Sequence, residues 1–193
     1  KQPSTRPVTQ PAVGTRPAST RPAATQPSNR VDIETSMGRI TIELAPEKTP
    51  LTVKNFLRYV DEKHYDNTQF HRVMQGFMIQ GGGFTLQGQQ KPTHDPIKNE
   101  SRQGLSNKRG TISMARSGHP DSATTQFFIN HADNLQLDRY GGGYTAFGKV
   151  VEGMNVVDKI AAAPVRVGPL TAPEPSQPVE PVTIKSIRRT STD

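Results

Sequence analysis

One stretch, residues 70–84, constrains the fold of this 193-residue chain more than any other. It places Arg72 and Gln80 among three phenylalanines and two methionines, and three consecutive glycines precede its last residue. The pattern predicts strand, turn, strand and a glycine-rich exit. If Arg72 and Gln80 point the same way as Phe77 and Met78, the result is an apolar hollow with a cation and an amide at its lip. Such a hollow suits a small apolar group that lies beside a peptide bond.

The same run, FHRVMQGFMIQGGGF, resembles the central signature of the cyclophilins, the peptidyl-prolyl cis-trans isomerases, whose pattern is close to FHR..xGFM.QGGDF. Three further motifs follow in the family's order: GTISMA at 110–115, TQFFIN at 125–130 and AFGKVVEGM at 146–154. Together the matches extend from about residue 31 to the end of the chain. The resemblance implies a mainly β fold, the cyclophilin-like closed eight-stranded antiparallel β-barrel with two capping α-helices.

Local patterns predict the elements of the first half. Apolar residues alternate with polar ones over 31–35 and 39–44, which is typical of half-buried strands and predicts an opening hairpin. The first helix follows: Thr49 can cap its first turn, Pro50 suits its first position, and we expect it to end near His64. Residues 85–109 are rich in Gly, Gln, Pro, Asn and Lys, and we predict a long surface loop that closes one side of the site.

Shorter elements are expected in the second half. Strands are predicted at 111–115, 126–130 and 144–150, and a second helix at 154–161 ends before Pro164. Residues 163–181 form a proline-rich loop, longer than a compact cyclophilin needs, and a last strand begins at Val182. Four phenylalanines are assigned to the core: Phe56 by the helical spacing of its apolar neighbours, and Phe70, Phe127 and Phe147 by strand alternation.

Arg72 is the candidate catalytic residue. Rotation about an X-Pro bond is opposed by a barrier of about 18–20 kcal/mol, because amide resonance must be broken. Twisting returns the lone pair to the prolyl nitrogen, so a guanidinium beside that nitrogen stabilises the transition state selectively. An arginine stays charged throughout the neutral range, so we expect little pH dependence there.

The resemblance implies the remaining site residues. The proline pocket is expected to be lined by Phe77, Met78, Phe128 and Leu137. Gln80 is expected to orient Arg72 or to bind a substrate carbonyl, and Gln126 adds a second amide. The backbone at Ala115 and Arg116 is expected to pair with the residues before the proline, as an edge strand does.

Two positions depart from the best-known eukaryotic members. Gln136 stands where those members often carry a tryptophan, and Tyr144, also expected in the substrate site, stands where they carry a histidine. The tyrosine resembles bacterial cyclophilins. Because the tryptophan helps to hold the immunosuppressant cyclosporin, we predict weak cyclosporin binding.

The basic charge of the chain belongs mostly to its start. Residues 1–30 hold five basic residues, six prolines and no acid, and the rest carries 19 basic and 17 acidic residues. The repeated Thr-Arg-Pro and Thr-Gln-Pro units predict a disordered linker or tether over 1–29, followed by the isomerase domain at 30–193. No aromatic residue is interleaved with these charges, so no nucleic-acid binding is expected. The linker and the bacterial-like site favour an exported bacterial protein, periplasmic or envelope-tethered, with a cytoplasmic protein as the alternative.

Other chemistries find little support in the sequence. No cysteine is present, which excludes disulfides and thiolate metal sites, and the five histidines lack the paired spacing of a metal site. No run of about 18 apolar residues predicts a transmembrane segment. We expect a monomer without a cofactor whose partners are proline-containing segments of client proteins. The rival hypothesis is a non-catalytic chaperone or scaffold that holds such segments in the same groove.

Overall fold

A computed structural model describes residues 29–190 of the chain. The predicted linker at 1–29 therefore lies outside the described residues except for Asn29, as do residues 191–193. The carbonyl of Asn29 accepts a hydrogen bond of 2.7 Å from the amide of Leu44, next to the first strand.

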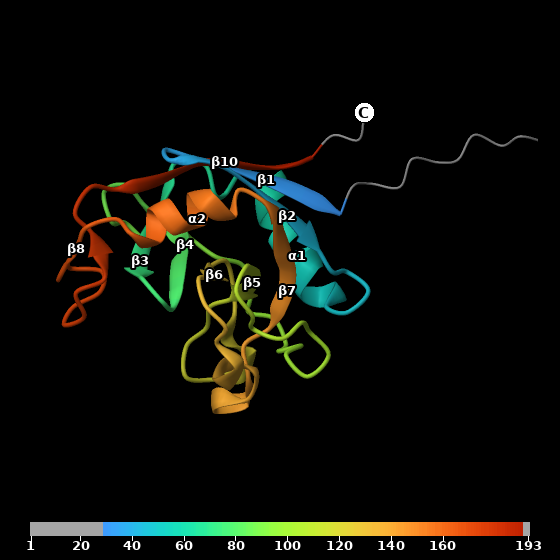
Figure 1. Cartoon of the computed structure of the whole chain (residues 1–193). Helices are drawn as coiled ribbons and strands as arrows, with labels where there is room; N and C mark the ends of the chain where they lie inside the picture. The colour runs from blue at the N-terminus through green and yellow to red at the C-terminus, as the bar shows by residue number, and fades with distance from the viewer. Residues whose placement is uncertain (1–28, 191–193) are drawn as a thin grey trace, which may run out of the picture.

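Eight antiparallel strands close into one barrel, which confirms the predicted fold class (Figure 1). Each strand pairs with a neighbour on both sides, in the order β1-β10-β3-β4-β6-β5-β7-β2. The bounds are β1 (Arg30–Thr35), β2 (Gly38–Leu44), β3 (Thr68–Met74), β4 (Met78–Thr85), β5 (Thr111–Met114), β6 (Phe127–Asn130), β7 (Ala146–Glu152) and β10 (Val182–Arg189).

Two helices, α1 (Pro50–Asp61) and α2 (Met154–Ala161), pack their apolar faces on this barrel at separate places (Figure 1). From α1, the ring of Phe56 lies 5.8 Å from that of Phe127 and 5.2 Å from that of Phe147. These three side chains and Phe70 are fully buried, as predicted. From α2, Val157 and Ile160 are fully buried in the same core cluster.

The proline-rich segment 163–181 contains a small hairpin of its own, built from β8 (Val165–Arg166) and β9 (Gln177–Pro178). Strand β9 of this hairpin lies against β3, and β8 pairs with β9 (Figure 1). Just before β9, the carbonyl of Ser176 accepts a hydrogen bond of 2.7 Å from the amide of Val73 on β3. The segment is thus attached to the barrel one residue away from Arg72.

Short 3₁₀ helices complete the chain: η1 (Pro120–Ser122), η2 (Leu135–Asp138) and η3 (Tyr140–Gly142). Helix α1 ends at Asp61, slightly earlier than expected, because Lys63 adopts a left-handed backbone conformation with a φ of 56° that no helix can continue.

The prediction that Thr49 caps α1 was wrong. Its hydroxyl donates to the carbonyl of Ala45 at 3.2 Å and makes no capping bond. Instead the buried carboxylate of Glu100, from the long loop before β5, accepts hydrogen bonds from the amides of Leu51 (3.2 Å) and Thr52 (2.8 Å). The hydroxyl of Thr52 donates to the same carboxylate at 2.8 Å. A carboxylate is favoured there because helix N-termini present unpaired amides and a partial positive charge.

We expect Glu100→Ala to lower the free energy of unfolding by about 2–3 kcal/mol, because it leaves two helix amides without their acceptor. Urea unfolding followed by circular dichroism measures the change. The matched control is Glu47→Ala, which removes an exposed glutamate just before the same helix and should change stability by less than about 0.5 kcal/mol. Equal effects of the two substitutions would contradict the capping role.

Candidate functional site

Strand alternation places the candidate residues on the outer face of the barrel. Successive side chains of a strand point to opposite faces. Val73 and Ile79 are buried in the core cluster, so their neighbours Arg72 and Gln80 face outward. Phe128 likewise lies between two core residues of β6. Arg72 pairs with Gln80 across β3 and β4, and Gln80 pairs with Phe128 across β4 and β6. The sheet register alone therefore sets the three side chains in one row.

This row lines a cavity of about 150 Å³. The cavity brings together nine of the ten predicted site residues: Arg72, Phe77, Met78, Gln80, Ala115, Arg116, Phe128, Leu137 and Tyr144. Met78, Phe128 and Leu137 are buried in an apolar cluster that is separate from the barrel core. A cavity of this size accommodates one benzene-sized ring.

The tenth residue, Gln126, does not line the cavity but supports it from outside. Its side-chain oxygen accepts a hydrogen bond of 3.0 Å from the amide of Gln80. Gly83 makes room for this contact, because a Cβ at that position would lie 2.5 Å from Cγ of Gln126.

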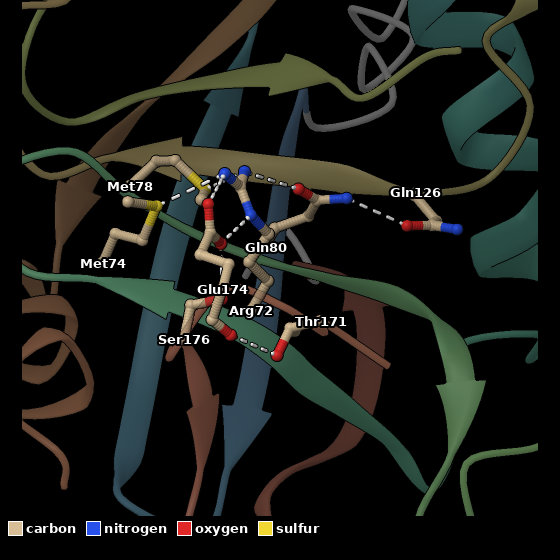
Figure 2. A network of polar contacts seen from close by, with 8 residues as sticks. All are labelled: Arg72, Met74, Met78, Gln80, Gln126, Thr171, Glu174 and Ser176. Atoms are coloured by element: carbon tan, nitrogen blue, oxygen red, sulfur yellow. Dashed lines mark hydrogen bonds and ion pairs between the residues drawn. The ribbon is translucent and has the colours of Figure 1, made fainter. Parts of the chain in front are cut away.

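Arg72 reaches the cavity through a network of polar contacts, shown in Figure 2. Its Nη1 points toward the side-chain oxygen of Gln80 at 3.5 Å and the sulfur of Met78 at 3.9 Å. On its other side, Nε and Nη2 donate to the two carboxylate oxygens of Glu174, at 2.7 and 2.9 Å. The shortest contacts of Arg72 are thus with Glu174 and not with Gln80, the partner that the sequence had suggested.

Glu174 was missed at the level of the sequence. It comes from the proline-rich segment, 102 residues beyond Arg72, and its carboxylate pKa is lowered to about 2, above all by the hydrogen bonds from the Arg72 guanidinium. The available signal was that Glu174 is the only acid in residues 163–179, between two prolines. Nothing in that local pattern indicates which cation it meets.

The opposite rim of the cavity carries a second guanidinium. Arg116 lies over the ring of Tyr144, with 4.2 Å between its Cζ and the ring centroid. Its nitrogens donate to backbone carbonyls, among them those of Gly141 at 2.7 Å and Gly143 at 3.1 Å. Tyr144 in turn meets the ring of Phe128 edge-on at 5.8 Å. These contacts hold one wall of the cavity in place.

Comparison of the sequence with known proteins identifies the family of this chain. Residues 30–189 match the family described as cyclophilin type peptidyl-prolyl cis-trans isomerase/CLD. The chain belongs to this family. It is 52% identical over 161 residues to a peptidyl-prolyl cis-trans isomerase of Acinetobacter baylyi, covering 81% of this chain and 86% of the relative. It is 54% identical over 135 residues to peptidyl-prolyl cis-trans isomerase B of Escherichia coli, covering 67% of this chain and 82% of that protein.

A solved structure shares the fold. The cyclophilin-type isomerase of Cryptosporidium parvum, crystallised in the presence of the dipeptide Ala-Pro, superposes with a TM-score of 0.70 at 29% identity. The match covers 84% of this chain and 99% of that one. The protein is thus a cyclophilin-type enzyme that catalyses cis-trans isomerisation of peptidyl-prolyl bonds, as predicted.

A larger hollow of about 860 Å³ lies elsewhere on this cyclophilin, along the outer face of α1 and beside Ile97 and Arg189. It contains none of the residues of the smaller cavity. Of the two, the smaller cavity is the better candidate site because it combines buried apolar side chains with Arg72 and Gln80.

His71, the neighbour of Arg72, points away from the site. It is buried, 4% exposed, and its ring meets that of Phe84 at 4.7 Å. Burial lowers the pKa of His71 to about 4, and the nearby charge of Arg72 adds to the effect. The imidazole therefore stays neutral at physiological pH and offers no proton to the cavity.

This lowered pKa predicts acid sensitivity. An unfolded chain takes up a proton at His71 near pH 6.5, whereas the folded chain does so only near pH 4, so the free energy of unfolding must fall as the pH drops between these values. Between pH 7 and pH 5 we expect a loss of about 2 kcal/mol from His71. Urea unfolding at the two pH values measures this loss. In His71→Gln the fall in the free energy of unfolding should be about 2 kcal/mol smaller than in the wild type. The control is His119→Gln, at an exposed position, which should retain the loss of the wild type.

Proposed function

We propose that Arg72 is the catalytic residue of this isomerase and that the cavity beside it binds the proline ring of the substrate. The observation that carries the proposal is the convergence of one guanidinium, one amide and an apolar floor on a cavity of about 150 Å³. The pyrrolidine ring would pack on Met78, Phe128 and Leu137. The prolyl nitrogen would then face Nη1 of Arg72.

The physical basis is selective stabilisation of the twisted amide. In either planar isomer the nitrogen lone pair is delocalised and is a poor acceptor, whereas in the transition state it is free to accept a hydrogen bond. A donor that gains strength only in the transition state raises kcat. No proton transfer or covalent bond is needed, which is consistent with an apolar cavity.

The flanking substrate residues are proposed to pair with the edge at Ala115 and Arg116. The Ala115 amide already donates to the carbonyl of Gln126 at 3.0 Å. A bound peptide would therefore use the carbonyl of Ala115 or the amide of Arg116, as an added strand does. Extended segments with an accessible X-Pro bond, in unfolded or flexible proteins, fit this edge.

The test is the rate of cis-trans exchange in a short Ala-Pro-Phe peptide. We expect Arg72→Ala to lower kcat/KM by about a hundredfold or more, the usual cost of removing one preorganised transition-state donor. Circular dichroism verifies the fold. Arg58→Ala, which removes an exposed guanidinium of α1 outside the site, is the control and should keep the wild-type rate.

Full activity of a folded Arg72→Ala variant would contradict the role of Arg72.

Weak cyclosporin binding is proposed on the basis of Gln136, which is exposed on η2 next to the cavity residue Leu137. An exposed glutamine offers little apolar area to an apolar ligand. We expect Gln136→Trp to raise the affinity about tenfold or more, since a tryptophan at an interface commonly contributes about 2 kcal/mol. Isothermal titration calorimetry measures the change, with Gln136→Ala as a control that should bind as weakly as the wild type. Equal affinities of all three would show that this position does not limit binding.

Two further proposals concern the oligomeric state of the protein and its location in the cell. A monomer is supported by the closed barrel, in which each of the eight strands is paired on both sides. Export to the bacterial periplasm or envelope is supported by the Thr/Pro/Arg-rich composition of residues 1–29, typical of a spacer. No helix within residues 29–190 is long and apolar enough to cross a membrane.

A further inference from the structure

The proline-rich segment between α2 and β10 places the carboxylate of Glu174 against the guanidinium of Arg72. Both oxygens of Glu174 are used: Oε1 accepts from Nε at 2.7 Å and Oε2 from Nη2 at 2.9 Å. Figure 2 shows Glu174 approaching Arg72 from one side, with Gln80 and Gln126 on the other. A two-point contact of this kind fixes the plane of a guanidinium as well as its position.

Glu174 is itself held from several directions. The hydroxyl of Ser176 donates to its Oε1 at 2.5 Å, and the hydroxyl of Thr171 donates to its backbone carbonyl at 2.9 Å. The backbone amide of Glu174 donates to the carbonyl of Thr171 at 2.8 Å. Ser176 is buried, 1% exposed, and its carbonyl bonds to Val73 of β3. The carboxylate is therefore fixed in place before any substrate arrives.

The contact leaves one nitrogen of Arg72 for the cavity. Nε and Nη2 are engaged by Glu174, and Nη1 has only longer contacts, 3.5 Å to Gln80 and 3.9 Å to Met78. The ion pair is about one-third exposed on both sides, so its contribution to folding stability is small. Its geometrical effect is larger, because without it the guanidinium could rotate about its last bonds among neutral partners.

We propose that Glu174 is a positioning residue, which clamps the guanidinium of Arg72 so that Nη1 faces the prolyl nitrogen of the bound substrate. The inference rests on the catalytic role proposed above for Arg72. It assigns a function to the proline-rich segment, which otherwise only connects α2 to β10.

The first test compares kcat and KM of the wild type and Glu174→Gln on the Ala-Pro-Phe peptide. The substitution keeps the shape of the side chain but removes its charge and one acceptor. We expect kcat to fall about fivefold, the effect of losing an interaction of about 1 kcal/mol. KM should stay unchanged, because the apolar contacts of the ring remain. Glu180→Gln, which removes the charge of an exposed glutamate of the same segment, is the control and should retain the wild-type kcat.

The second test separates positioning from a general disturbance of the segment. In an Arg72→Ala background Glu174→Gln should cause no further loss, whereas a purely structural role would lower the rate again. Nuclear magnetic resonance of the Arg72 Nε–H gives an independent readout: its signal should shift and its exchange with water should accelerate in Glu174→Gln and not in Glu180→Gln.

The outcomes distinguish the two proposals. If Arg72→Ala retains activity, the role of Arg72 fails and the positioning role fails with it. If Arg72→Ala is impaired but Glu174→Gln matches the wild type, only the positioning role is overturned. A higher kcat in Glu174→Gln would overturn it as well, since the carboxylate would then weaken the cation instead of orienting it.

Discussion

Closure of the eight strands into a barrel decides where everything else in this protein can lie. A barrel of eight strands can be filled by its own side chains, and the buried core cluster fills the interior of this one. Phe127, Ile79 and Val73 fill that interior, and the alternate side chains of the same strands stand outside. The candidate site consequently lies on the outer face of the barrel, on strands whose inward side chains form the core. The side chains that line the candidate site thus stand on the same strands as the packed core.

A guanidinium on the outer face of the barrel needs partners that fix its orientation and still leave one of its nitrogens accessible. Arg72 stands beside apolar and sulfur-containing side chains, which offer apolar contacts but orient a guanidinium poorly. The carboxylate of Glu174 supplies the missing directional contact, and its low pKa keeps it charged throughout the neutral range. The ion pair of Arg72 and Glu174 thus sets a directed hydrogen-bond donor beside an apolar surface.

Much of the fold was predictable because the signals are local. The alternating strands, the apolar stripe of α1 and the four core phenylalanines depend on spacing within a few residues, and the structure confirms them. The errors arose where a distant residue replaced a local one. Thr49 has the side chain of a helix cap, yet Glu100 makes the bonds to the helix, because the loop before β5 passes across the end of α1.

By itself the sequence indicated the strands that carry Arg72, Gln80 and Phe128, and its resemblance to the cyclophilins implied the nine residues that line the cavity. Only the tertiary structure decided that Glu174 meets Arg72 across 102 residues of chain. The physical reason is that a charge in a proline-rich segment has no periodic partner. Its contacts depend on the path of the whole segment and on its attachment to β3 through Ser176 and Val73.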